Sequence, residues 1–94
     1  MSDYRFPDAE NTACMVCSHV LEERVPILRV THDDEDGMWQ FLCGAPDHES
    51  HHAKIIALVQ AVELDPSVNE LNEMPCGDGA TREAINAQWQ PFKL

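Results

Sequence analysis

The feature that most constrains the fold is a single change in hydrophobic period along the chain. Up to Cys43 the apolar residues occur in short β-favouring runs, whereas from Ser50 to Leu64 they recur at helical spacing. Strands followed by helices are typical of α+β domains. We therefore expect an α+β fold in which a small antiparallel sheet of about three strands carries roughly two to three helices on one face.

Two of the expected strands form a hairpin. The β-favouring runs at residues 25–32 and 38–43 are separated by the charged segment 33–37, which ends in Asp-Gly. Asp-Gly between two such runs is a strong hairpin signal. A third β-favouring run covers residues 14–21 and supplies the remaining strand.

The helical part of the sequence begins after this hairpin. An apolar stripe at i, i+3, i+4 and i+7 predicts a helix over residues 50–64. Its members are Ile55, Leu58, Val59 and Val62. Asp65 followed by Pro66 has the pattern of an N-cap with proline at the first helical position, which predicts a second, short helix. A last helical turn or two is expected over residues 80–88.

The length of 94 residues allows one domain. Residues 1–12 are polar with mixed charges, so we expect a loose N-terminal arm followed by a single domain over residues 13–94. A core of this size is marginally stable without help, which makes a stabilising metal or disulfide worth seeking.

The charge balance separates partner classes. The chain has 17 acidic and 6 basic residues, a net charge of −11, and the basic residues are scattered. Nucleic-acid binding needs clustered Lys and Arg, so we expect none. Neither an apolar run of membrane-spanning length nor a signal peptide is present, which predicts a cytoplasmic protein without membrane contact. Its acidic surface fits a basic protein partner.

The richest chemistry lies in a group of cysteines and histidines. Cys14 and Cys17 have the spacing of half a zinc knuckle, and Cys17 and His19 share a face if both lie on a strand. Cys43 ends the hairpin and His48 follows it by five residues. If the first strand lies beside the second hairpin strand, Cys17, His19, Cys43 and His48 converge on one zinc ion. The alternative is that the reduced cysteines are buried as small apolar side chains.

Three further patterns are weaker. His48-Glu49-Ser50-His51-His52 matches the H-E-x-x-H pattern of zinc hydrolases, but such an enzyme also needs a third protein ligand and a substrate cleft. A redox function for the Cys14–Cys17 pair requires a thiol at a helix N-terminus, whereas a strand is expected here. Cys76 lies in a turn and is expected to be a lone thiol.

Several segments together form a recognisable pattern: Cys17-Ser18-His19-Val20, Pro26-Ile27-Leu28, Asp36-Gly37-Met38-Trp39-Gln40-Phe41-Leu42-Cys43-Gly44, His48 and Asp65-Pro66-Ser67. With these segments the chain resembles a family of short uncharacterised bacterial proteins and, more distantly, a toxin-immunity-like domain of unknown function. The resemblance implies that the Cys-Ser-His-Val and Phe-Leu-Cys-Gly segments belong together. It favours Cys17, His19, Cys43 and His48 as ligands, with Cys14 as an alternative to His19, and it does not include the H-E-x-x-H pattern.

The sequence therefore predicts a small, acidic, non-enzymatic α+β module with zinc as its candidate cofactor. An immunity-type protein that binds a basic toxin or enzyme is the alternative. A metal-dependent hydrolase that uses His48, Glu49 and His52 is a minor alternative.

Overall fold

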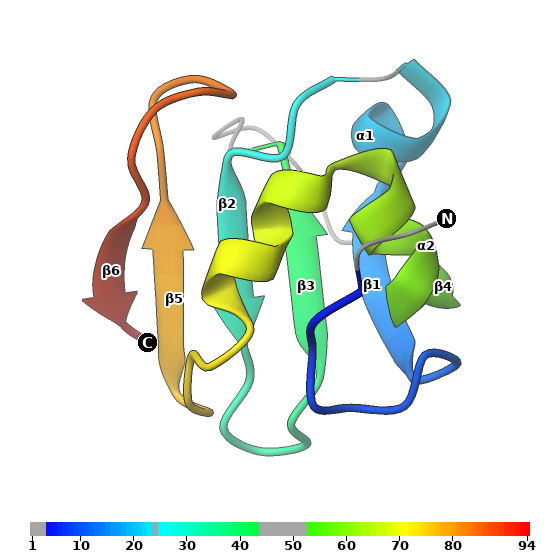
Figure 1. Cartoon of the computed structure of the whole chain (residues 1–94), viewed down its shortest axis with the longest axis vertical. Coiled ribbons are helices and arrows are strands. Elements are labelled where there is room, and N and C mark those ends of the chain that lie inside the picture. Colours follow the sequence, from blue (N-terminus) through cyan, green and yellow to red (C-terminus); the bar gives the residue numbers. More distant parts are fainter. Residues whose placement is uncertain (1–3, 24, 44–52) are drawn as a thin grey trace.

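The computed structural model describes residues 4–23, 25–43 and 53–94 and has one six-stranded mixed sheet (Figure 1). The strand order is β4-β1-β3-β2-β5-β6. In chain order the elements are β1 (Ala13–Cys17), α1 (Ser18–Glu23), β2 (Arg29–His32), β3 (Trp39–Leu42), β4 (Ala53–Ala57), α2 (Leu58–Leu64), the 3-10 helix η2 (Pro66–Leu71), β5 (Asp78–Thr81) and β6 (Gln90–Lys93).

The α+β class holds, but the expected antiparallel sheet of about three strands is wrong. β1 and β3 are parallel, and every other neighbouring pair is antiparallel. The predicted hairpin is confirmed, because β2 pairs with β3 from Arg29↔Leu42 to His32↔Trp39. The three additional strands, β4, β5 and β6, have only four or five residues each. Such short strands leave little periodic signal in a sequence.

The predicted helix over residues 50–64 is wrong in the part that the structure describes before Leu58. Residues 53–57 form β4, which pairs with β1 along its whole length, and α2 begins only at Leu58. The predicted apolar stripe spans two elements. Leu58 and Val62 of α2 are fully buried, whereas Ile55 of β4 is 57% exposed. Pairing with β1 satisfies the backbone groups on one side of this edge strand, and the β-branched side chain of Ile55 suits a strand.

The helical turn expected over residues 80–88 is also wrong. β5 continues to Thr81, a loop follows, and β6 returns beside β5. In contrast, the start of the second short helix is confirmed at Asp65, whose side chain accepts a hydrogen bond from the backbone N–H of Ser67. That element is a 3-10 helix, η2, and its Val68 is fully buried.

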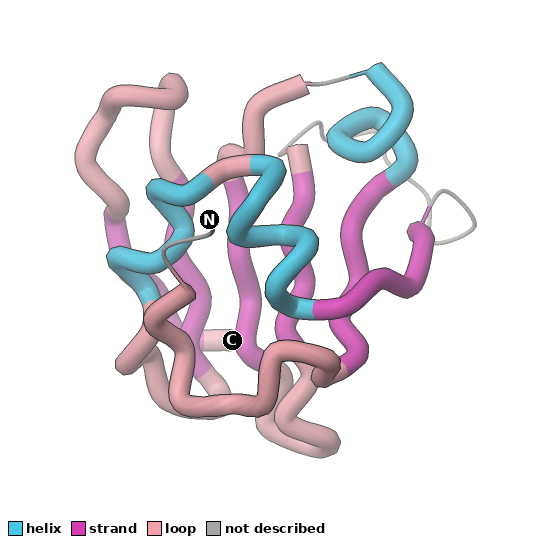
Figure 2. The backbone as a smooth tube through the Cα atoms, turned by 45° about the vertical axis from the view of Figure 1, so that its right-hand side comes forward, coloured by secondary structure: helices cyan, strands magenta, loops and turns pink. Residues whose placement is uncertain are grey.

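The core lies between the sheet and the α2–η2 segment, which crosses one face of the sheet over β1, β3 and β2 (Figure 1). The turned view shows the same segment passing across the strands (Figure 2). Val16, Phe41, Val30 and Ala80 occupy successive positions across the four central strands and are all buried. This row meets the buried side chains of the helices, so one apolar layer is enclosed.

The segment expected to be a loose arm contributes to this core where the structure describes it. Phe6 is 5% exposed and meets Trp39 edge to face, with 4.9 Å between the ring centroids. The indole N–H of Trp39 donates a hydrogen bond to the Asp8 carboxylate at 3.1 Å. Phe6 and Asp8 thus both attach the N-terminal segment to Trp39, the first residue of β3.

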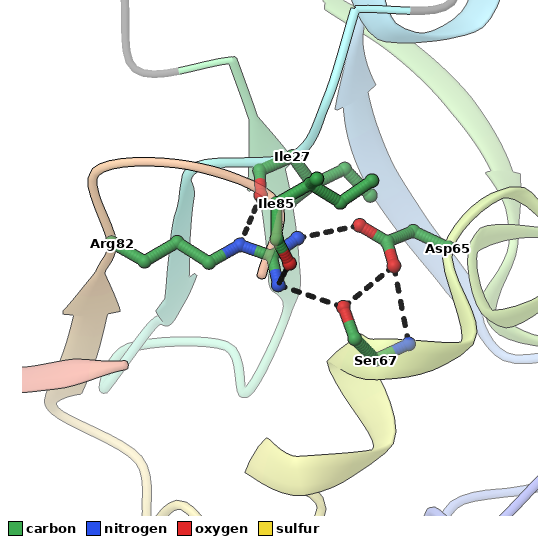
Figure 3. A network of polar contacts seen from close by, with 5 residues as sticks. All are labelled: Ile27, Asp65, Ser67, Arg82 and Ile85. Atoms are coloured by element: carbon green, nitrogen blue, oxygen red, sulfur yellow. Dashed lines mark hydrogen bonds and ion pairs between the residues drawn. The ribbon is translucent and has the colours of Figure 1, made fainter. Parts of the chain in front are cut away.

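A buried polar network connects the loop after β5 with the start of η2 (Figure 3). Arg82 pairs with Asp65 at 2.6 Å, and it also donates to the backbone carbonyls of Ile27 and Ile85 and to the Ser67 hydroxyl. Ser67 in turn donates to Asp65 at 2.6 Å. Residues far apart in the sequence are therefore joined through one guanidinium group.

None of the helices in the described ranges is both long enough and apolar enough to cross a membrane.

Candidate metal centre

Three potential metal ligands meet at one edge of the sheet. Cys17 is the last residue of β1, His19 lies in the first turn of α1, and Cys43 directly follows β3. Because β1 and β3 are parallel neighbours, with Val16 opposite Phe41, their carboxyl ends reach the same edge. The parallel pairing thus brings Cys17 beside Cys43, and the chain turns into α1 at that point and carries His19 with it.

The ligand atoms of these three residues are close. The two sulfur atoms and one imidazole nitrogen all lie within 4.8 Å of one another. Zinc bonds of about 2.0–2.3 Å at tetrahedral angles place ligand atoms roughly 3.5–3.8 Å apart. Any separation in the group must therefore shorten by at most about 1 Å when a metal is held. Rotations of the side chains supply movements of this size.

Burial distinguishes the two thiols from the imidazole. Cys17 is 2% exposed and Cys43 is 7% exposed, whereas His19 is partly exposed. Sulfur and imidazole nitrogen are ligands that zinc favours. Two thiolates in an apolar setting need a compensating positive charge, and a divalent cation supplies it. The group can therefore hold a metal ion on chemical grounds.

The expected reason for the proximity of Cys17 and His19 is wrong. The two residues do not lie on one strand, because β1 ends at Cys17 and α1 starts at Ser18. Their potential ligand atoms come close through the strand-to-helix turn. Sequence spacing suggested the pair, but the turn that brings them together has no strong local signal, since the first turn of α1 contains no acidic residue.

Cys14 does not join this group in the described part of the chain. Alternate residues of a strand face opposite sides of the sheet, which puts Cys14 with Val16 on the core face. Its thiol is completely buried, and this burial raises the pKa of Cys14 to about 12. A protonated thiol is a poor metal ligand, because the thiolate is the form that binds.

The remaining predicted residues lie outside the described ranges. His48 belongs to residues 44–52, as do Glu49 and His52 of the H-E-x-x-H pattern. The fourth ligand and the hydrolase pattern thus stay sequence-based predictions.

Cys76 was expected to be a lone thiol, and it is free, exposed and outside the group of Cys17, His19 and Cys43. Its sulfur lies 3.5 Å from Nε2 of His32, a contact that was not expected. The two residues are 44 positions apart, so no local pattern reveals this contact.

We compared the chain with protein-family models, with curated proteins and with solved structures, and none of these comparisons found a match. A functional proposal therefore depends on the geometry of the chain itself.

Proposed function

We propose that this chain is a small, non-enzymatic module whose fold is stabilised by one zinc ion. Cys17, His19 and Cys43 supply three ligands, and His48 supplies the fourth. The observation that supports this proposal is the approach of three zinc-favouring side chains to within 4.8 Å. The position of His48, five residues after Cys43 in the sequence, supports it as the remaining ligand.

The elements that zinc joins explain why it stabilises the fold. The parallel pair β1–β3 lacks a tight turn, since α1 and β2 intervene in the sequence. Parallel strands need long connections, so closing this pair costs chain entropy. A metal bound between Cys17 and Cys43 fixes the two strand ends to each other. Its binding free energy then contributes directly to folding, as in other small zinc domains.

The chemistry favours a structural role over a catalytic one. Structural zinc sites use four protein ligands, mainly Cys and His, whereas catalytic sites keep one position open for water or substrate. Here both thiols are nearly inaccessible to solvent. A site built from two buried thiolates and two imidazoles is closed, and it leaves no position for substrate.

Metal analysis and thermal unfolding test this proposal. We expect the purified chain to bind one zinc ion, and the midpoint of thermal unfolding to rise when zinc is added to metal-free protein. At a free zinc concentration of about 100 times Kd the expected stabilisation is about 2.7 kcal/mol. Cys17→Ser, Cys43→Ser and His19→Gln should each abolish most of this rise.

Matched controls separate the ligands from their neighbours. Cys76→Ser removes a thiol that lies at the opposite end of the sheet from the proposed zinc ligands. This variant should keep the full zinc response. His48→Gln should weaken zinc binding, while His51→Gln should not. A zinc response that survives both Cys17→Ser and Cys43→Ser would exclude this site. If only His48→Gln is without effect, the three-residue group stands and the fourth ligand lies elsewhere.

A second candidate function is an immunity-type module that binds a basic protein. The supporting observation is the turn between β2 and β3, where Asp34, Glu35 and Asp36 are exposed. Together with Asp33 and Leu94 they line a hollow of about 300 Å³. Clustered exposed carboxylates raise the association rate of a basic partner tenfold or more at low salt.

Charge neutralisation at two places tests this second function. A basic protein that co-purifies with the chain at low salt would be identified by mass spectrometry, purified and rebound. Neutralising the turn with Asp34→Asn, Glu35→Gln and Asp36→Asn should lower its association rate about tenfold. The matched triple change Glu63→Gln, Glu70→Gln and Glu73→Gln should have a smaller effect. Binding that is insensitive to salt and to both changes would contradict the idea.

A further inference from the structure

The structure places a second reactive pair at the opposite end of the sheet from the candidate metal centre. His32 is the last residue of β2, and Cys76 lies in the turn that leads into β5. Their side chains approach to 3.5 Å between Sγ and Nε2, which is within hydrogen-bonding distance for sulfur. Cys76 is exposed, so its thiol is accessible to small molecules.

The histidine ring is held in one orientation. Its Nδ1 lies 2.8 Å from the backbone carbonyl of Met74. A carbonyl only accepts hydrogen bonds, so Nδ1 carries a proton and, in the neutral ring, Nε2 is the acceptor. The ring also stacks on Trp39 with 3.9 Å between centroids. The basic nitrogen therefore faces the thiol.

The backbone fixes the position of the thiol. Gly77 adopts a φ of +90°, a conformation that L side chains rarely adopt, and its N–H donates to the carbonyl of His32 at 2.7 Å. The turn that carries Cys76 is thus attached directly to the end of β2. A nucleophile, a base and a group that orients the base are all present, the arrangement that activates nucleophilic side chains.

We propose that Cys76 is a site of thiol–disulfide exchange with small disulfides and that His32 acts as its base. The thiol proton of Cys76 moves to Nε2 of His32, and the sulfur attacks one sulfur of the disulfide. A new S–S bond forms to Cys76 while the original S–S bond breaks. The departing thiolate takes the proton from His32, so the products are a mixed disulfide and one free thiol. This inference is independent of the zinc proposal.

The charges around Cys76 and His32 determine whether a cationic or an anionic disulfide reacts faster. A Cβ on Gly77 would lie 3.6 Å from a carboxylate oxygen of Asp34, and Asp78 is the strand partner of His32. Lys93 offsets Asp78 through an ion pair at 2.7 Å. Beside His32 a pocket of about 410 Å³ is lined by several residues, including the charged side chains Arg5, Asp8 and Glu73. This balance is acidic and favours a cationic disulfide over an anionic one.

The other thiols are poor competitors. Cys14, Cys17 and Cys43 are all buried, and only Cys76 is exposed. A small disulfide can therefore reach Cys76 more easily than the other thiols of the folded chain, so modification is expected at Cys76.

Exchange rates measured by mass spectrometry test the proposal on the full chain. Near pH 6.5 an ordinary thiol with a pKa of about 8.5 is only about 1% ionised, so help from a base is most visible there. We expect His32→Gln to slow exchange with neutral 2-hydroxyethyl disulfide at least fivefold. Near pH 9.5, where most free thiols are ionised, the two rates should converge. Cys76→Ser should form no mixed disulfide.

Charge selection is tested with two disulfides of similar size. Cystamine is a dication and 3,3′-dithiodipropionate is a dianion. The ratio of their rates at Cys76 should exceed the same ratio for N-acetylcysteine amide, a neutral model thiol, at least fivefold. Asp34→Asn should reduce this excess.

A rate for His32→Gln equal to that of the unaltered chain near pH 6.5 would overturn the role of the base. If circular dichroism shows that this variant does not fold, the exchange rate of the unaltered chain tests the proposal instead. Its Cys76 should then react with 2-hydroxyethyl disulfide at least fivefold faster than N-acetylcysteine amide near pH 6.5. An equal or slower rate would overturn the proposal.

Discussion

Nη2 of Arg82 lies 2.6 Å from Oδ2 of Asp65, and their side chains are 1% and 10% exposed (Figure 3). This ion pair joins the loop after β5 to Asp65, the N-cap residue that precedes η2. The Arg82 guanidinium also lies 4.2 Å from the Trp89 ring centroid, so its other surface is covered by an aromatic ring. A charge enclosed in this way depends on its partner, because water cannot replace the carboxylate.

Asp65→Asn should therefore destabilise the fold strongly. Asn keeps the size of the side chain and an acceptor for the η2 N-cap, but it leaves the Arg82 charge uncompensated. We expect the free energy of unfolding to fall by about 3–5 kcal/mol in urea denaturation. The exposed Glu63→Gln removes the same charge two residues away and should change stability by less than about 0.5 kcal/mol. Similar values for the two variants would show that the ion pair is not enclosed.

Phe6→Ala tests the docking of the N-terminal segment. The ring packs against Trp39 and, at 6.4 Å between centroids, against Phe41. Its removal should lower the free energy of unfolding by about 3–5 kcal/mol, as for other large core deletions. Leu94→Ala shortens an exposed apolar side chain and is the control. A loss for Phe6→Ala no larger than the control would indicate an arm that does not contribute to the core.

Gly79→Ala tests the close contact between β5 and β6. A Cβ at this position would lie 2.5 Å from Cζ of Phe92, so the ring must move. That ring also contacts Arg29, whose guanidinium carbon lies 4.7 Å from its centroid. We expect a loss of about 1–3 kcal/mol from overpacking. In a Phe92→Ala background the same change should cost much less, and a double-mutant cycle measures the difference. Additive losses would contradict the contact.

Cys14 gives the chain a defined response to alkaline pH. Burial raises the pKa of its thiol from 9.0 to about 12 in the folded chain. The folded value lies above the unfolded one, so this contribution to stability is complete below about pH 9 and is lost as the pH rises toward 12. Over this window metal-free protein should lose about 1.4 kcal/mol per pH unit through Cys14. Cys14→Ala should flatten the slope, and an unchanged slope would refute the assignment.

The sequence identified the elements that carry strong local signals. The Asp-Gly turn between two β-favouring runs gave the β2–β3 hairpin, and Asp65 with Pro66 gave the start of η2. Both signals depend on interactions within a few residues. The helix predicted from the apolar stripe that includes Ile55 was wrong, because apolar spacing does not show where a strand ends and a helix begins.

The candidate site was predictable only in part. Residue chemistry and the expected pairing of the first strand beside the second hairpin strand suggested Cys17, His19 and Cys43. That pairing is confirmed by β1 and β3, but the placement of His19 on the strand was wrong. The contact between Cys76 and His32 had no sequence signal, since 44 positions separate them. Arg82 likewise had no pattern to mark it as the partner of Asp65.

By itself, the sequence determined the hairpin, the capped start of η2 and the residue types available for metal binding, because each follows from local chemistry. Only the tertiary structure decided that β1 lies parallel to β3, that β4, β5 and β6 extend the sheet, and which distant side chains meet. Strand order and side-chain contacts between distant residues depend on how all segments jointly bury their apolar faces and pair their backbone groups. No single segment specifies that arrangement.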